Sequence, residues 1–325
     1  MSYTERHVFQ RRISLLEFLL QHGWKPTRDQ GREEVAGLCP LHRESRPSFY
    51  VNRRKQVFYC HGCGRGGGLA QLVRLLDLCG ELPAPAPTTH GLPEKLLEHT
   101  YRFYQWHLAH SPDAGAYLAG RGIHDPAVVR RMRIGYAPGA SLRGYLARLG
   151  YPRPALGERG LIDPRGRDAF FRCLTFPLPA AGNLYGRSIS DGLCRHRFLP
   201  GSKGGLYGWE QPLPFPRVIL VEGLFDLAAL WQAGFDDAVA GLGTHLNPLQ
   251  LTQLGRLDAG VVYICFDADA NGSGARAAYR LSGQLRQAGV EALRVALPPG
   301  HDPNSFFVAG ATAVDFQRCL EGARP

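Results

Sequence analysis

Four metal-binding side chains constrain the fold of this chain more than any other feature of its sequence. They are Cys39, His42, Cys60 and Cys63. The first two form the motif Cys-Pro-Leu-His, the last two form Cys-His-Gly-Cys, and 17 residues separate the motifs. At this spacing, four sulfur and nitrogen donors can reach one tetrahedral Zn²⁺ ion. We expect one structural zinc, because a site closed by four protein ligands has no open position for a reacting water.

The segment between the two motifs is typical of a zinc ribbon. Residues 47–52 and 55–60 alternate apolar and polar side chains, as strands do, and the stretch between them suits a hairpin turn. His61 is a rival to His42, but it lies inside the second motif and is expected to point away from the metal. Reduced cysteines without metal are the other alternative, although four donors at the correct spacing seldom coincide.

The composition sets limits on the class of protein. The 325 residues are 44% hydrophobic and 20% charged, which suits a soluble chain of two or three domains. The formal charge of +10 favours a polyanionic partner such as nucleic acid. No apolar run approaches the roughly 18 residues that span a bilayer. Residues 1–12 also lack the apolar stretch of a secretion signal, so we expect a cytoplasmic protein with reduced cysteines.

Cations and aromatic rings are mixed around the zinc-binding motifs. A sequence-tolerant groove for a single nucleic-acid strand needs this combination, with cations for phosphates and ring faces for bases. The alternative is a solvated surface with its rings in a small core, because a module of this size needs rings for packing. The cations include Arg53, Arg54 and Lys55, and the rings are Phe49, Tyr50, Phe58 and Tyr59.

A proline-rich segment divides the chain. Residues 81–93 favour a stiff extended linker over a helix or a central strand. We place a zinc-ribbon domain at 1–80, a mixed region at 94–214, and a regular region with a short C-terminal tail at 215–325. In the last region, strand-like and helix-like segments alternate, which predicts a parallel α/β sheet covered by helices on both faces. The predicted fold class is therefore a multidomain combination of α/β and α+β.

Acidic side chains follow the expected strands of the last region. Glu222 comes directly after one strand, Asp267 and Asp269 after another, and Asp302 soon after a third. Parallel strands end at one edge of their sheet, where ligands bind, so these carboxylates are expected to converge. Converging carboxylates repel one another unless a divalent cation such as Mg²⁺ neutralises them. The site therefore favours phosphoryl chemistry, as nucleotidyl transfer or phosphodiester cleavage. The strands concerned are expected at residues 217–221, 260–266 and 293–297.

Four motifs in this region resemble the Toprim fold of primases, topoisomerases and some nucleases. They are Glu-Gly-Leu-Phe-Asp at 222–226, Ala-Gly-Leu-Gly-Thr at 240–244, Phe-Asp-Ala-Asp at 266–269 and Asp-Pro-Asn at 302–304. Together with the zinc motifs, Tyr-Leu-Ala-Gly-Arg-Gly-Ile at 117–123 and Ile-Gly-Tyr-Ala-Pro at 134–138 resemble bacterial DnaG-type DNA primases. The resemblance covers nearly the whole chain. It implies an enzyme that copies single-stranded DNA into short RNA primers from ribonucleoside triphosphates.

The resemblance also implies roles for individual residues. Glu222 matches the essential glutamate of the family, and Asp267, Asp269 and Asp302 match its metal-binding aspartates. These four would hold catalytic Mg²⁺ or Mn²⁺. Asp226 belongs to the same motif as Glu222 and is either a catalytic residue or only a cap for the helix that it begins. Basic positions that face nucleotide and template in the family correspond here to Arg172, Arg187, Arg197 and Lys203, with surface charge as the alternative for the last two.

The chain departs from the family pattern in two places. Asn304 stands where the last motif usually has a second aspartate, and an amide contributes less to metal binding than a carboxylate. The chain also stops soon after the Toprim region, where chromosomal primases continue into a domain that binds the replicative helicase. We therefore expect a shortened primase from a plasmid, phage or other mobile element. Its protein partner would be a replicative helicase or an element-encoded replication protein.

Two other functions are possible interpretations of this sequence. One uses the same acidic residues to cut DNA, and the other is binding without catalysis. A Toprim nuclease or topoisomerase would cut DNA, although a topoisomerase needs a nucleophilic tyrosine on a domain for which we find no room. The remaining interpretation is a zinc-dependent single-stranded-DNA-binding protein with an inactive core. The presence of Glu222, Asp267 and Asp269 argues against inactivity.

Overall fold

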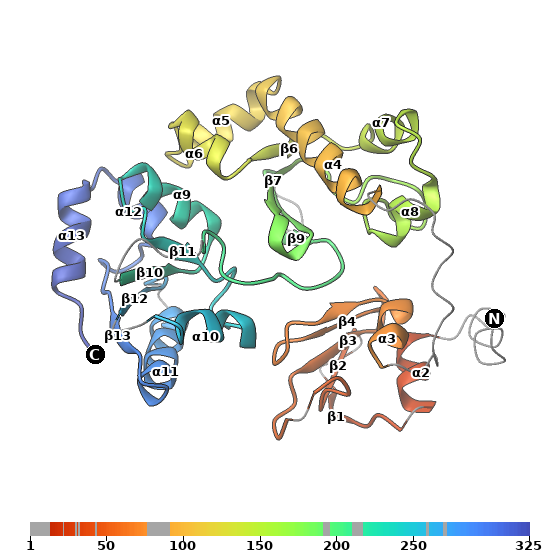
Figure 1. Cartoon of the computed structure of the whole chain (residues 1–325), viewed down its shortest axis with the longest axis horizontal. Helices are drawn as coiled ribbons and strands as arrows, with labels where there is room; N and C mark the ends of the chain where they lie inside the picture. The colour runs from red at the N-terminus through yellow and green to blue at the C-terminus, as the bar shows by residue number, and fades with distance from the viewer. Residues whose placement is uncertain are drawn as a thin grey trace. The chain divides into compact units, whose positions relative to one another are not determined.

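The structure of the chain is a computed structural model. It describes residues 14–21, 23–29, 31, 33–42, 44–76, 92–190, 196–209, 217–257, 260–268 and 272–325. Contacts divide the chain into two compact units, Met1–Lys95 with Pro200–Ser202, and Leu96–Leu199 with Lys203–Pro325. Figure 1 shows the helices and strands of each. None of the helices in the described ranges has the length and apolarity needed to cross a lipid bilayer.

The first unit contains an antiparallel sheet of five strands in sequential order. The predicted hairpin is confirmed, because β3 and β4 pair in register through residues 49–52 and 57–60. Two further strands, β1 and β2, extend the sheet on the other side of β3 and come before the first zinc motif in the chain. The strands are β1 (Pro26–Asp29), β2 (Glu34–Gly37), β3 (Phe49–Asn52), β4 (Val57–Cys60) and β5 (Gly66–Gly67), with helices α2 (Leu15–Gln21) and α3 (Leu69–Leu75).

The alternation of side chains along β3 and β4 sorts the aromatic rings of the ribbon. Phe49 and Phe58 are buried in the core and stack with 5.1 Å between ring centroids. Tyr50 and Tyr59 face each other across the two strands and remain partly exposed. The packing interpretation is therefore correct for the two phenylalanines, whereas the tyrosines are only partly buried.

The second unit begins with short helices around an antiparallel sheet. Of the linker expected at 81–93, residues 81–91 lie outside the described residues, whereas 92 and 93 form the first turn of α4. A first helical turn accommodates proline, because its N–H groups have no acceptor within the helix. The helices are α4 (Leu92–Ala109), α5 (Pro112–Gly120), α6 (Pro126–Arg131), α7 (Leu142–Arg148) and α8 (Arg153–Glu158). The sheet has the order β6 (Gly135–Ala137), β7 (Cys173–Leu178), β8 (Asn183–Ser188) and β9 (His196–Phe198).

The predicted parallel sheet is confirmed in the second unit, with the strand order β11-β10-β12-β13. Residues that alternate along β10 enter two different cores. Ile219 and Val221 pack with α9, α12 and α13, whereas Val218 and Leu220 pack with α10 and α11. Helices therefore cover both faces, as the alternating pattern predicted. The strands are β10 (Arg217–Val221), β11 (Ala238–Ala240), β12 (Val261–Cys265) and β13 (Glu291–Arg294). The helices are α9 (Leu224–Gln232), α10 (Pro248–Leu254), α11 (Ser273–Gln287), α12 (Pro303–Val308) and α13 (Ala313–Glu321).

Single residues from other parts of the unit pair with both outer strands of this sheet. Tyr207 exchanges two backbone hydrogen bonds with Ala240 of β11, at 2.9 and 3.0 Å. Arg324 does the same with Arg294 of β13, at 2.7 and 3.1 Å.

Candidate functional site

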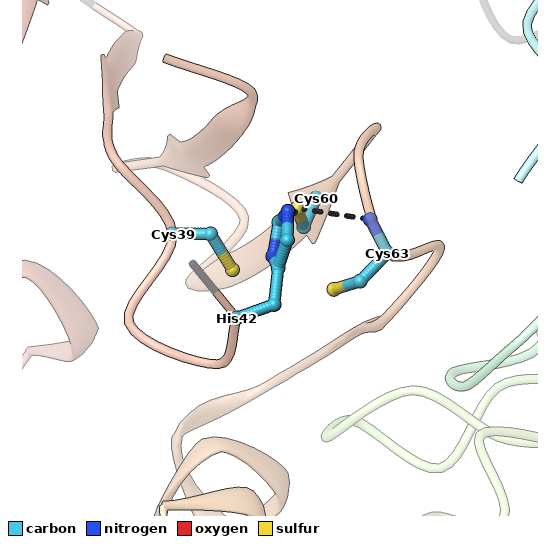
Figure 2. Close-up of side chains that lie close together, drawn as sticks. All are labelled: Cys39, His42, Cys60 and Cys63. Carbon is cyan, nitrogen blue, oxygen red and sulfur yellow. Dashed lines mark hydrogen bonds between the residues drawn. The ribbon is translucent and has the colours of Figure 1, made fainter. Parts of the chain in front are cut away.

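The four predicted zinc ligands lie together in the first unit. Their donor atoms are all within 4.8 Å of one another. Figure 2 shows the imidazole of His42 and the thiols of Cys39, Cys60 and Cys63 gathered around one point. Backbone N–H groups of Leu41 and Cys63 donate to the sulfurs of Cys39 and Cys60, each at 3.4 Å, which favours their thiolate forms. Three thiolates and one imidazole at this distance fit a tetrahedral zinc ion.

Glu44, which the sequence did not single out, supports this site. The Nδ1 atom of His42 lies 3.9 Å from the sulfur of Cys60, so it is the nitrogen that faces the cluster. The Nε2 atom lies 3.2 Å from the Glu44 carboxylate, which also accepts hydrogen bonds from the N–H groups of Cys39 and Ser48, at 2.6 and 3.2 Å. A carboxylate behind a ligating histidine fixes the ring orientation and raises its basicity.

The three thiols of the cluster differ in how readily they lose a proton. A hydrogen bond from Cys39 lowers the pKa of Cys60 to about 5 and raises the pKa of Cys39 itself. Burial raises the pKa of Cys63. One sulfur therefore carries negative charge readily, and bound zinc would replace the remaining protons, since metal ligation requires thiolates. His61 lies outside the cluster, with its ring edge-on to Tyr50 and Tyr59, as predicted.

Three of the predicted acids line one cleft of about 480 Å³ in the second unit. Glu222 lies directly after β10, Asp267 lies two residues after β12, and Asp302 begins α12. The N–H of Asp267 donates to the Glu222 carboxylate at 3.2 Å, which ties two strand ends together. The acids therefore meet at the carboxyl edge of the sheet, as expected. Asp269 lies outside the described residues.

Asp226 lies beneath these acids and also lines the cleft. Its carboxylate accepts hydrogen bonds from the N–H groups of Gly223 and Asn304, at 3.0 and 3.2 Å, so that it caps α9 and ties it to α12. Burial, together with the charges of Asp302 and Asp267, raises its pKa to about 8. Burial is the main cause, and the neighbouring carboxylates add a repulsion that a divalent cation would relieve.

Cations also line the cleft. Arg187 of β8 and Lys203 do so, and they are two of the four basic positions marked by the resemblance. Arg121, which the sequence placed only within a motif, lines the cleft too. The Lys203 ammonium donates to the carbonyl of Leu242 at 3.2 Å and lies 4.8 Å from the ring centroid of Phe198. Leu242 has a left-handed backbone with φ of 58°, a strained conformation that is concentrated at functional loops. Acidic and basic side chains thus line the same cleft.

The other basic residues predicted to bind nucleic acid lie elsewhere. In β9, His196 and Phe198 line the cleft, whereas Arg197, which lies between them in the strand, does not. Arg172 is half-exposed just before β7, with φ of 47°. Arg53, Arg54 and Lys55 form the turn between β3 and β4, where Arg54 lies 3.4 Å from Glu33.

Asn304 does not line the acidic cleft. Its side chain is 2% exposed and donates to the carbonyl of Arg121 at 2.7 Å. The side chain of Asn304 is thus engaged in a contact within the protein. It connects α12 to the segment that carries Arg121.

Comparisons with known proteins agree with both sites. The CHC2 zinc finger family matches residues 22–78, and the Toprim-like family matches residues 219–307. The DNA primase of Aquifex aeolicus is 32% identical over 300 residues, which cover 82% of this chain and 59% of that protein. Over most of its length, the chain is similar to DnaG-type DNA primases. The DNA primase of Myxococcus xanthus is 30% identical over 357 residues, covering 97% of this chain and 57% of the relative.

Solved primase structures share the fold. The zinc-binding and RNA polymerase domains of the Aquifex aeolicus primase match 99% of this chain and 86% of that one, with a TM-score of 0.65 and 28% identity. A DnaG primase catalytic domain bound to single-stranded DNA matches 72% of this chain and 81% of that one, with a TM-score of 0.60 and 26% identity. The chain spans a little over half the length of the primases that it matches in sequence.

Proposed function

We propose that this chain is a DNA primase that makes short RNA primers on single-stranded DNA from ribonucleoside triphosphates, by metal-dependent nucleotidyl transfer. One observation carries the proposal: carboxylates from three segments and cations from three others line the same cleft. A polynucleotide and a nucleoside triphosphate are both polyanions, and their phosphates need cations at one side and a metal site at the other. The primase relatives support this choice of substrates.

The acidic and the basic side chains of this cleft would have different roles in the reaction. Glu222, Asp267 and Asp302 would hold the metal, and Asp269 is proposed as a further ligand from its motif alone. Bound Mg²⁺ or Mn²⁺ would stabilise the charge that develops at the α-phosphate as the 3′-hydroxyl attacks. Arg187, Lys203 and Arg121 would bind phosphate oxygens and align the triphosphate, since cations fixed in place stabilise developing charge.

Two surfaces are proposed to bind the template. On the ribbon, Tyr50 and Tyr59 stand side by side on adjacent strands and could stack bases, while Arg54 and Lys55 in the adjoining turn could bind phosphates. In the second unit, the ring of Phe171 is 63% exposed, rests against Gly139 and precedes Arg172. Exposed rings beside cations are typical of single-strand binding surfaces.

Primer synthesis is the direct test. Purified protein is incubated with unprimed single-stranded DNA, labelled ribonucleotides and Mg²⁺ or Mn²⁺, and short labelled products are expected. Asp267→Asn should reduce product at least about 100-fold, because the amide cannot replace a charged metal ligand. Template binding should remain largely intact. Glu291→Gln is the control, since Glu291 is an exposed acid at the opposite end of β13.

The same experiment separates the other functions. Shortened template would identify a nuclease, and binding without product would identify a single-strand-binding protein. Robust primer synthesis by Asp267→Asn would exclude the assigned catalytic role.

A further inference from the structure

Three side chains of β8 and β9 form a continuous set of contacts in the wall of the acidic cleft. Arg187 and His196 are directly opposite each other in the antiparallel pair. An Nη atom of Arg187 lies 2.5 Å from Nε2 of His196, and Nδ1 of His196 lies 2.7 Å from the Tyr185 hydroxyl. All three side chains line the cleft that contains Glu222 and Asp267. His196 therefore lies between a phenol and a guanidinium.

The chemistry of these partners determines the state of the imidazole. A guanidinium has only donors and stays charged, so Nε2 of His196 must accept and carry no proton. The ring is then neutral, with its proton on Nδ1, and it donates to the Tyr185 oxygen. Burial raises the pKa of Tyr185 to about 12, so the phenol keeps its own proton at neutral pH. A protonated imidazole would place a second cation against Arg187.

Because the imidazole of His196 is a neutral acceptor, it does not cancel the positive charge of Arg187. In the part of the chain that the structure describes, no carboxylate lies within ion-pair distance of its guanidinium. A carboxylate would fix the side chain but cancel its charge. An imidazole fixes one of the five N–H groups, restricts a side chain with high rotamer entropy, and leaves the positive charge for an incoming anion.

We propose that His196 is a positioning residue that holds Arg187 toward the cleft as a neutral hydrogen-bond acceptor, so that Arg187 can bind a phosphate group. The inference rests on the proposed function, since it assumes that phosphates enter this cleft. Both a nucleoside triphosphate and the DNA backbone carry the required phosphate.

Two substitutions of His196 distinguish positioning from packing. The side-chain oxygen of glutamine can take the place of Nε2, whereas asparagine ends near the place of Nδ1 and cannot reach Arg187. His196→Gln should therefore keep affinity within about twofold, and His196→Asn should lower it about fivefold, as expected when a hydrogen bond to a charged group is lost. Affinity is measured by fluorescence anisotropy, separately for labelled oligothymidylate and for a fluorescent ATP analogue, which identifies the source of the phosphate.

The Arg187→Ala background shows whether His196 acts through Arg187. His196→Asn should have no further effect there, because the group that it positions is gone. Equal affinities for the Asn and Gln variants, or additive losses in the double variant, would overturn the proposal. So would an Arg187→Ala protein that binds both probes as the wild type does.

A direct measurement keeps this inference separate from the proposed function. In protein labelled with ¹⁵N-histidine, the two ring nitrogens of His196 should show a neutral imidazole with its proton on Nδ1 at pH 7.5. His196→Gln identifies the signal by its disappearance. A cationic ring, or a proton on Nε2, would refute the proposed positioning even if the protein makes primers. The expected tautomer in a protein without primer synthesis would leave the positioning intact and reject only the activity.

Discussion

Asp226 is the residue whose ionisation should control the stability of the second unit. Its pKa is raised from 3.8 to about 8, so the folded chain holds a proton that the unfolded chain releases near pH 4. The contribution of Asp226 to the free energy of unfolding is therefore most favourable at low pH and is lost as the pH rises toward 8. In Mg²⁺-free buffer, we expect this group to lower the free energy of unfolding by up to about 1.4 kcal/mol per pH unit in this range.

The measurement compares chemical unfolding of the wild type and Asp226→Ala between pH 5 and 8. Alanine removes the titration together with the two hydrogen bonds to Gly223 and Asn304. The advantage of the wild type should shrink as pH rises. Parallel stability profiles for the two proteins would show that Asp226 ionises normally.

At the residue scale, ligand identities were easier to predict than the contacts that support them. The zinc ligands and the acids Glu222 and Asp267 follow from spacing and from strand ends. Glu44 and Asn304 act through hydrogen bonds to distant or buried groups, and no periodic pattern marks such contacts. Asn304 contacts the carbonyl of a residue 183 positions away. The contact of Asn304 therefore could not be predicted from its motif.

At the scale of single elements, the start of α11 determines where Asp267 lies. A Cβ atom on Gly274 would come within 2.2 Å of the Asp267 carbonyl oxygen, so only glycine lets the helix approach this closely. Gly274→Ala should displace Asp267 and reduce primer synthesis about tenfold or more, since small misplacements of reacting groups are costly. Activity and Mg²⁺ binding are measured on the same preparation.

Gly283 in the same helix provides the matched control. A Cβ atom there meets nothing within 4 Å. Gly283→Ala should raise stability by about 0.5–1 kcal/mol, as alanine does in a helix interior, and leave synthesis unchanged. Full activity in Gly274→Ala would show that the Asp267 backbone can move without consequence.

Elements with strong apolar patterns were predicted well. The expected strand at 217–221 is β10, whereas the expected strand at 293–297 overlaps β13 (Glu291–Arg294) only at residues 293 and 294. The region from 111 to 172 remained largely unassigned, because its helices have only six to nine residues and show little periodicity. Helix caps were the available signal there: Ser111 and Asp125 each precede a proline and cap the helix that follows.

At the scale of the whole molecule, the division into two compact units predicts that loss of zinc has a limited effect. Cys60→Ser removes one of four ligands, and structural zinc contributes on the order of 10 kcal/mol to small domains of this kind. We expect the first unit to unfold, while the second unit keeps its unfolding transition and its Mg²⁺ binding. Calorimetry and zinc content measure both effects, and priming on DNA should fall.

Cys319→Ser is the control, because Cys319 belongs to the second unit and lies far in sequence from the zinc motifs. It should retain zinc and both transitions. Complete unfolding of Cys60→Ser would mean that the two units depend on each other for stability.

The order of strands in the parallel sheet also belongs to the scale of the whole molecule, and it was not predicted. The strands β11 and β12 follow each other in the chain, but they lie on opposite sides of β10 in the sheet.

The pairing of Tyr207 with β11 and of Arg324 with β13 affects how the protein behaves at high concentration. The outer strands of an open sheet present unsatisfied N–H and C=O groups that can recruit strands from other molecules. Here the bridges at Ala240 and Arg294 occupy such groups on both sides. The parallel sheet is thereby protected at these positions against edge-to-edge aggregation.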